Sequence, residues 1–185
     1  MALRPSQRND SVIDALAEHR APAALEIVPE ALTSEVALAL ITQLNAELSA
    51  SYPEPGTTHF RLDPGEVAPG AGVFVVARWE GQPVGCGALR CIRDPKLLRE
   101  LGPRVGELKR MYVAPDSRGQ GVGRALLERL EDEARKLGLD RLVLETGNRL
   151  PGALALYARA GFTGIPAYGE YVASASTSVC LAKDL

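Results

Sequence analysis

A glycine-rich loop is the feature of this sequence best suited to chemistry. It follows an apolar run over residues 108–113 and opens an amphipathic run over residues 125–137. Glycines let the backbone pass close to a bulky anion, and the free N–H groups at a helix start point at that anion, aided by the helix dipole. Flanking arginines add charged donors. We therefore predict a pyrophosphate site made by Arg118, Gly119, Gln120, Gly121, Val122, Gly123 and Arg124.

The loop matches neither of two common phosphate-binding motifs. No Gly-Lys-Ser or Gly-Lys-Thr follows it, so it is not a Walker P-loop. A dinucleotide fingerprint would need a third glycine where Arg124 stands. Taken alone, the loop is compatible with a nucleotide site, a coenzyme site, or a turn that only caps the next helix.

The composition is that of an ordinary globular domain. The chain has 185 residues, 46% of them hydrophobic, and a formal net charge of -2. This charge gives no reason to expect nucleic acid or an anionic membrane as a partner, and no apolar run approaches a membrane span. Residues 1–22 have mixed charge and no apolar core, so we expect a loose leader rather than a secretory signal, followed by one domain over residues 23–185.

The cysteines and histidines point to neither disulfides nor metal. Cys86, Cys91 and Cys180 are widely spaced, and we expect buried, reduced thiols in a cytoplasmic protein. The two histidines, His19 and His59, form no ligand pair with finger spacing, so no metal is expected.

Local patterns predict strands first and then alternating strands and helices, which favours a mixed α/β sheet with helices on its faces. The expected strands cover residues 24–28, 73–79, 83–92, 105–113, 140–145, 168–172 and 177–182, and the expected helices cover residues 30–50, 94–101, 125–137 and 151–160. Thr33 or Ser34 is a candidate cap for the first helix. Residues 51–72 are rich in proline and glycine and predict a long, functional or mobile loop.

Two segments together resemble a known family. The segment 111–123 is similar to the acetyl-CoA-binding motif of the GNAT superfamily of N-acetyltransferases, with Arg118, Gly121 and Gly123 at its core positions. The segment 153–162 is similar to the family's Ala-x-x-x-Tyr-x-x-x-Gly-Phe signature. The resemblance covers residues 24–185, and both segments occur in the family's order.

The resemblance implies a GNAT fold: a mixed, mostly antiparallel sheet of six or seven strands with splayed central strands and about four helices. Acetyl-CoA, the cosubstrate, would lie in the gap between the strands at residues 107–113 and 140–145. Its pantetheine would pair with backbone groups near Met111, Tyr112 and Val113, and its pyrophosphate would sit on the glycine loop.

The resemblance also assigns catalytic roles for direct attack of an amine on the thioester. Tyr157 would protonate the departing thiolate, since a phenol is a suitable acid for it, although the residue is also compatible with simple packing. Glu107 is the first candidate for the general base, and Glu145 is the second. Glu107 is also compatible with pairing to Lys109 or Arg110. A backbone N–H near Tyr112 or Val113 would hold the thioester oxygen.

Strand alternation places side chains on opposite faces of the strand at residues 105–113. It predicts Glu107, Lys109, Met111 and Val113 on one face, and Leu108, Arg110 and Tyr112 on the other.

One position departs from the family pattern. Many relatives carry an asparagine seven residues before the tyrosine, where this chain has Leu150, and Asn148 lies two residues earlier. Asn148 is therefore only a candidate contact for the pantetheine or the acceptor.

The acceptor is the least constrained part of the interpretation. A primary amine of a small molecule or amino-acid-like compound is expected, with a protein or peptide amine, or a non-catalytic CoA-binding sensor, as alternatives. Expected walls of the acceptor pocket are Tyr168, Glu170 and Tyr171, and the loop residues Tyr52, Glu54, His59 and Arg61. His59 is also a minor candidate for a base. A homodimer is expected from the resemblance.

Overall fold

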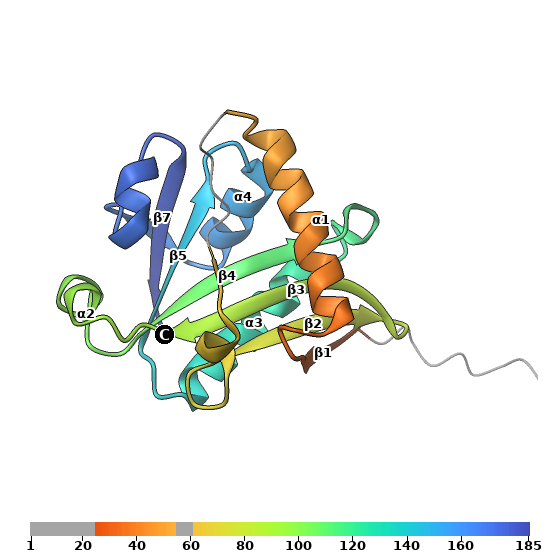
Figure 1. The fold of residues 1–185 in the computed structure, drawn as a ribbon, viewed down its shortest axis with the longest axis horizontal. Coiled ribbons are helices and arrows are strands. Elements are labelled where there is room, and N and C mark those ends of the chain that lie inside the picture. Colours follow the sequence, from red (N-terminus) through yellow and green to blue (C-terminus); the bar gives the residue numbers. More distant parts are fainter. Residues whose placement is uncertain (1–24, 55–60) are drawn as a thin grey trace, which may run out of the picture.

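The computed structural model describes residues 25–54 and 61–185. These residues form a seven-stranded sheet with the order β1-β2-β3-β4-β5-β7-β6 (Figure 1). β4 and β5 are parallel, and every other neighbouring pair is antiparallel. The mixed, mostly antiparallel sheet is thereby confirmed. The strands are β1 (Leu25–Pro29), β2 (Gly72–Trp79), β3 (Gln82–Cys91), β4 (Val105–Val113), β5 (Arg141–Gly147), β6 (Thr163–Ile165) and β7 (Ser178–Asp184).

Four α-helices and three short 3-10 helices connect these strands in the described ranges. They are α1 (Glu35–Ser51), η2 (Pro64–Val67), α2 (Pro95–Leu101), η3 (Pro115–Ser117), α3 (Val122–Lys136), α4 (Pro151–Arg159) and η4 (Gly169–Ser174). The number of α-helices agrees with the expectation. Helix α1 begins later than predicted because the Ser34 Oγ accepts a hydrogen bond from the Ala37 N–H at 3.1 Å, which makes Ser34 the N-cap.

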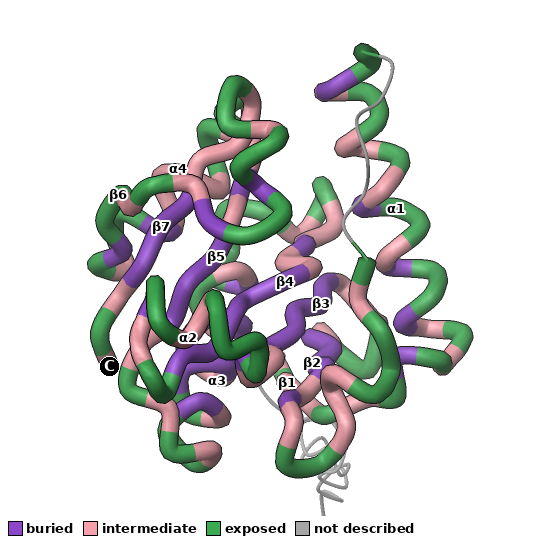
Figure 2. Tube along the Cα trace, turned by 60° about the vertical axis from the view of Figure 1, so that its left-hand side comes forward, coloured by how far each residue is buried: buried purple, intermediate pink, exposed green. Residues whose placement is uncertain are grey.

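The helices cover both faces of the sheet. Apolar residues of α3 and α4 pack against one face, in a cluster that includes Leu126, Leu130 and Tyr157. Residues of α1 pack on the opposite face over β2 and β3, and α2 and η4 pack on that same face over β5 and β7. Figure 2 shows buried residues along the central strands and exposed residues along the outer sides of the helices.

The prediction of a strand over residues 168–172 is wrong. This segment lies in and next to η4, and the penultimate strand is instead β6 (Thr163–Ile165), which pairs with β7. A 3-10 turn brings residues three apart to the same side. Tyr168 and Tyr171 both use this geometry to reach the carboxylate of Glu107.

The predicted alternation along β4 is also wrong beyond Lys109. Arg110 has a left-handed backbone with φ 58°, and the pairing of β3 with β4 shifts register at this point. Such a bulge reverses the facing of all later residues. Leu108, Met111 and Val113 consequently pack together toward α3, whereas Arg110 and Tyr112 face α1.

The predicted leader at residues 1–22 and the candidate base His59 both lie outside the described residues. Within the described ranges, no helix has the length and apolar character needed to cross a membrane.

Candidate active site

Strands β4 and β5 part at the centre of the sheet. Their pairing runs from Val105 opposite Arg141 to Leu108 opposite Leu144 and goes no further, although both strands continue. The edge of β4 beyond Leu108 therefore has no β5 partner in the described structure. The bulge at Arg110 lies in this stretch and turns β4 away from the regular ladder.

A cavity of about 360 Å³ opens where the strands part. β4 contributes Leu108, Lys109, Arg110 and Met111 to its lining, and β5 contributes Glu145, Thr146 and Gly147. Tyr157 enters from α4, apolar residues Leu44 and Leu48 from α1, and Tyr171 and several small residues from η4 and β7. The cavity thus collects polar groups from strands and helices that are far apart in the sequence.

The glycine loop leads from the end of β4 into α3. Gly119 and Gly121 have φ of 75° and 86°, a left-handed backbone that favours glycine. Gly121 is the N-cap of α3 and has no side chain to satisfy the first N–H groups of the helix. Gly123 has a packing role, since a Cβ there would lie 3.4 Å from the Leu156 side chain. The loop therefore presents backbone donors at a helix start, as an anion site requires.

The polar side chains of the glycine loop are exposed, and each makes a hydrogen bond or an ion pair. The Arg118 guanidinium donates to the Val113 carbonyl at 2.9 Å and pairs with Glu47 of α1 at 2.5 Å. Arg124 pairs with Glu128 one turn along α3 at 2.7 Å. Gln120 donates to the Asp116 carbonyl at 3.1 Å. Exposed pairs of this kind contribute little to stability, so an anion can compete for these arginines at small cost.

The residues before the loop divide between the two faces of the sheet. Met111 lines the cavity and packs beside Gly87 and Leu130, and Val113 packs in the same cluster. Tyr112 packs under α1 and donates to the Gln43 side chain at 3.3 Å.

Tyr157 lies in the part of the cavity wall that α4 contributes. The residue is 5% exposed, and its ring meets Phe162 edge-on, with the ring centroids 5.7 Å apart. Burial, with a smaller contribution from Glu145, raises the pKa of the Tyr157 phenol above its ordinary value. The hydroxyl is therefore protonated at neutral pH.

Glu145 shares this cavity with Tyr157. Burial raises the pKa of the Glu145 carboxyl above its ordinary value, although a hydrogen bond from Ser178 and the charge of Lys109 act in the opposite direction. Within the described residues, no cation lies at ion-pair distance from Glu145. A half-buried carboxylate of this kind holds a proton more tightly than an exposed one.

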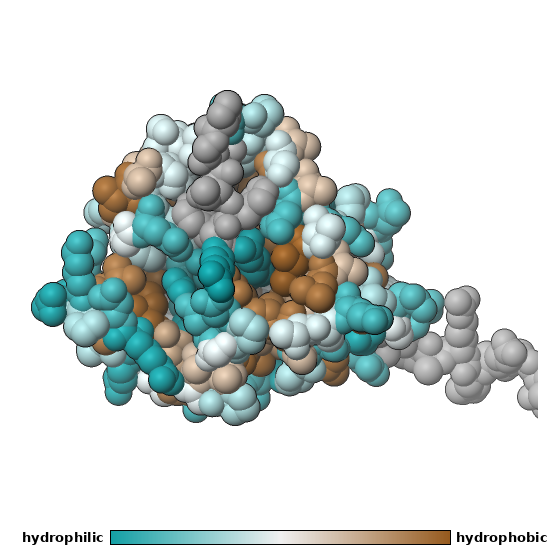
Figure 3. Space-filling view, viewed as in Figure 1, coloured by the Kyte–Doolittle hydropathy of each residue, from teal (hydrophilic) through white to brown (hydrophobic). Residues whose placement is uncertain are grey.

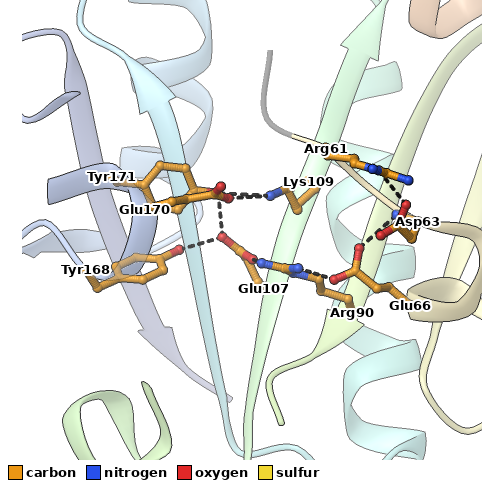
Figure 4. A network of polar contacts seen from close by, with 9 residues as sticks. All are labelled: Arg61, Asp63, Glu66, Arg90, Glu107, Lys109, Tyr168, Glu170 and Tyr171. Carbon is orange, nitrogen blue, oxygen red and sulfur yellow. Dashed lines mark hydrogen bonds and ion pairs between the residues drawn. The ribbon is translucent and has the colours of Figure 1, made fainter. Parts of the chain in front are cut away.

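Glu107 sits in a different environment. It is 0% exposed, and its carboxylate accepts hydrogen bonds from the Arg90 Nε at 2.6 Å, the Tyr171 hydroxyl at 2.7 Å and the Tyr168 hydroxyl at 3.0 Å (Figure 4). Burial and the neighbouring Glu107 raise the pKa of both tyrosines, which keeps both hydroxyls as donors.

The network extends from Glu107 on both sides. Arg90 also pairs with Glu66, which accepts from the Asp63 N–H at 2.8 Å. Although burial alone would lower it, the pKa of Arg90 is raised because Glu107 and Glu66 both stabilise the cation. On the other side, the Lys109 Nζ lies 3.2 Å from both the Glu170 carboxylate and the Tyr171 hydroxyl. Figure 4 shows these groups joined across β3, β4 and η4.

Glu107 lines a second cleft, of about 470 Å³, rather than the cavity between the strands. The walls of this cleft include Arg61, Glu66, Arg90, Tyr168 and Glu170. Figure 3 shows a hydrophilic surface at the centre of this face. Tyr171 borders both hollows and lies between them.

A family model supplies the observation that decides the family. The acetyltransferase (GNAT) family model matches residues 38–162, which include the splayed strands, the glycine loop and Tyr157. The chain belongs to the GNAT family.

Individual relatives of the chain support its assignment to the GNAT family. An IAA acetyltransferase from Azospirillum brasilense is 38% identical over 145 residues, which are 78% of this chain and 88% of the relative. A solved structure from Klebsiella pneumoniae, assigned as an acyl-CoA N-acyltransferase, has a TM-score of 0.71 and 31% identity, with 87% of this chain and 97% of that chain covered. This GNAT chain is therefore an acyltransferase.

A third relative supports the GNAT fold. A GNAT family acetyltransferase from Elizabethkingia anophelis, solved with acetyl-CoA bound, has a TM-score of 0.58 and 19% identity, with 87% of this chain and 98% of that chain covered. The TM-scores show that the chain shares its overall fold with these GNAT neighbours.

The remaining predicted site residues of the GNAT chain are divided between the two hollows and the surface. Asn148 is exposed, and its side-chain amide donates to the Ser176 carbonyl at 3.0 Å. Of the predicted acceptor walls, Tyr52 and Tyr171 line the central cavity, whereas Arg61, Tyr168 and Glu170 line the second cleft. Glu54 pairs with Arg149 at 2.5 Å.

Arg90 and Arg110 are two charged residues near the hollows that the sequence motifs did not identify as site residues. Arg90 is a charged residue near the end of an otherwise mostly apolar strand, and Glu107 is its register partner on β4. Opposite charges in neighbouring apolar strands are a usable signal for such a pair. Within residues 25–54 and 61–185, no group of three or more His, Cys, Asp or Glu side chains is arranged to hold a metal ion.

Proposed function

We propose that this acyltransferase moves the acetyl group of acetyl-CoA to a primary amine of a small molecule by direct attack. The observation that carries the proposal is that Glu145 and Tyr157 line one cavity where β4 and β5 part. That cavity lies beside the strand that leads into the glycine loop. The candidate base Glu145, the candidate acid Tyr157 and the candidate anion site in the glycine loop therefore lie close to one another.

Donor binding uses the residues that the resemblance indicated. The backbone N–H groups of Gly121, Val122 and Gly123, with Arg118, Gln120 and Arg124, would hold the pyrophosphate at the start of α3. The unpaired edge of β4 near Met111 offers backbone groups to the pantetheine. The bound acetyl-CoA in the Elizabethkingia anophelis relative supports this donor.

Proton transfer favours Glu145 as the base. A bound ammonium must lose a proton before its nitrogen attacks the thioester carbon, and a carboxylate with a raised pKa is a suited acceptor. As the new C–N bond forms, the C–S bond breaks, and the Tyr157 hydroxyl gives its proton to the sulfur. The nitrogen then loses its second proton to complete the amide, and that proton restores the Tyr157 hydroxyl. A backbone N–H near the bulge, at Tyr112 or Val113, would stabilise the oxyanion.

Glu107 remains an alternative base, but its contacts favour a structural role. Three donors already occupy its carboxylate. To accept a proton it would have to give up part of a buried ion pair, which is costly. The Arg90–Glu107 pair is instead suited to hold β3, β4 and η4 in place beneath the cavity.

The test is release of CoA thiol from acetyl-CoA by the full chain, with and without a panel of small primary amines. We expect release that depends on an amine, together with formation of the N-acetyl product. Release that requires a peptide or protein amine would contradict a small-molecule acceptor, and no release with any amine would contradict the proposal as a whole.

The location of the reaction is part of the same proposal. The three cysteines are free thiols in the structure, and Cys86 is buried, which raises the pKa of its thiol to about 12. Unpaired thiols of this kind are expected of a cytoplasmic protein, and we place the enzyme there.

A further inference from the structure

We propose that the acceptor amine also carries a carboxylate, and that Arg110 binds this carboxylate while Glu145 faces the amine. The inference rests on the proposed function and names its substrate class. It follows from the charges that line the cavity between β4 and β5.

Of the residues that the structure describes, three charged ones line that cavity: Lys109, Arg110 and Glu145. The charge of Lys109 is balanced by Glu170, because its ammonium lies 3.2 Å from the carboxylate of that residue. Within the described ranges, Arg110 has no carboxylate at ion-pair distance, and its hydrogen bond to the Asn45 amide oxygen is long, at 3.4 Å. Among the described residues, Arg110 and Glu145 are thus the two charges in the cavity that lack an ionic partner.

The environment of Arg110 favours an added anion. Burial lowers the pKa of the Arg110 guanidinium below its ordinary value, and the surrounding groups Tyr171, Cys86 and Glu170 only partly oppose this. Tyr171 and Cys86 are neutral at pH 7, since both pKa values are raised. Glu170 is already engaged by Lys109. A half-buried guanidinium without an ionic partner gains most from an anionic ligand.

The backbone directs Arg110 toward the acceptor side. Its φ of 58° is unusual for a residue with a side chain, and such strain gathers at functional sites. Without the bulge, Arg110 would follow the alternation of the strand and face α3. With the bulge, it reaches Asn45 on α1, next to Leu44 and Leu48 of the cavity wall.

The donor does not account for Arg110. The predicted pyrophosphate site uses Arg118 and Arg124 in the loop after β4, whereas Arg110 lies within β4 under α1. A single guanidinium suits a singly charged carboxylate. A doubly charged phosphate would also meet the negative charge of Glu170, which lies near enough to act on Arg110.

The complementary end of the cavity is Glu145. An α-amino acid presents an ammonium and a carboxylate a few bonds apart, which matches one carboxylate and one guanidinium in the same cavity. Leu44, Leu48 and Tyr52 form an apolar wall on one side of α1 and suit an apolar side chain.

The first experiment compares matched acceptors on the wild-type full chain. Phenylalanine is paired with phenethylamine, leucine with isopentylamine, and each amino acid with its amide. Ethanolamine phosphate is the phosphate probe. We expect kcat/KM for each amino acid to exceed that of its carboxylate-free partner roughly 10- to 100-fold, the usual range for a charged hydrogen bond.

The second experiment uses the Arg110→Gln variant. It should lose most of this preference, with a rise in KM for phenylalanine of roughly 10- to 100-fold and phenethylamine changed less than about threefold. Arg99→Gln, an exposed arginine of α2 that lines neither hollow, is the control and should keep the wild-type ratio. Affinity for acetyl-CoA, measured by calorimetry, should be unchanged in both variants.

The outcomes separate the two proposals. Equal kcat/KM for amino acids and their carboxylate-free partners would overturn the role of Arg110 and leave the acetyltransferase proposal standing. A preference for ethanolamine phosphate would overturn the claim that the acceptor carries a carboxylate. Failure to acetylate any amine would overturn both. The wild-type ratio needs no variant to fold, so the inference is testable even if Arg110→Gln is unstable.

Discussion

Glu107 and Glu145 lie on the same face of two neighbouring strands, yet they line different hollows. Glu107 is the register partner of Val143 on β5, and Glu145 lies two residues further along that strand. This offset carries Glu145 past the point where β4 and β5 part and into the central cavity, while Glu107 remains where the strands are still paired. The same residue type is thereby given a buried ion pair in one position and an open cavity in the other.

The pH dependence of the rate should report Glu145. As the base it must be ionised, so kcat/KM should fall as the pH drops through its raised pKa. The amine also titrates, and the Glu145→Gln variant serves as the control because its residual rate reports the amine alone. A wild-type profile that superimposes on that of Glu145→Gln would contradict the assignment.

Tyr157→Phe should lower kcat while substrate binding changes little. The change removes only the hydroxyl that would protonate the thiolate, and loss of a general acid typically costs about 10²–10⁴ in rate. Tyr168→Phe is a matched control, since its hydroxyl bonds to Glu107 away from the cavity. Full turnover by Tyr157→Phe would mean that Tyr157 only packs against Phe162.

Gly121→Val should abolish binding of acetyl-CoA while the chain still folds. The Gly121 backbone is left-handed, and a side chain there strains the loop that we propose presents N–H donors to the pyrophosphate. Gly138→Val is the control because Gly138 also has a positive φ and open space around it, at the other end of α3. Calorimetry should show normal acetyl-CoA affinity in the control. Unchanged affinity in Gly121→Val would remove the loop from the donor site.

Glu107→Ala should destabilise the fold. The change leaves the partly buried Arg90 guanidinium without one of its two carboxylates and removes the acceptor of two tyrosine hydroxyls. Breaking a buried ion pair from one side costs about 3–5 kcal/mol, which thermal or urea unfolding will detect. A variant as stable as the wild type would argue against a structural role for Glu107.

Much of the fold was predictable because its signals are local. The glycine loop, the apolar strands and the Ala153–Phe162 segment each carry their pattern within a short stretch of sequence. The overall order of strands and helices follows from such patterns, and the structure confirms the mixed sheet and the number of α-helices.

The errors arose where tertiary contacts override local preference. Nothing in the sequence Leu108-Lys109-Arg110-Met111 marks a bulge, since it contains no glycine, yet the bulge decides which side chains face α1. The segment 168–172 has the composition of a strand but forms η4 because Tyr168 and Tyr171 bind Glu107. Both errors concern the proposed acceptor side, whereas the donor motif, the homodimer and the leader remain predictions.

The most direct test of the account compares two conservative variants, Glu145→Gln and Glu107→Gln, by CoA thiol release at neutral pH with saturating acetyl-CoA and an amine acceptor. Each keeps the shape of the side chain and removes its charge, and circular dichroism at low temperature establishes that each is folded. We predict that Glu145→Gln loses about 10²–10⁴ in kcat, whereas folded Glu107→Gln keeps kcat within about tenfold of the wild type. The reverse order, with Glu107→Gln folded but inactive and Glu145→Gln active, would contradict it.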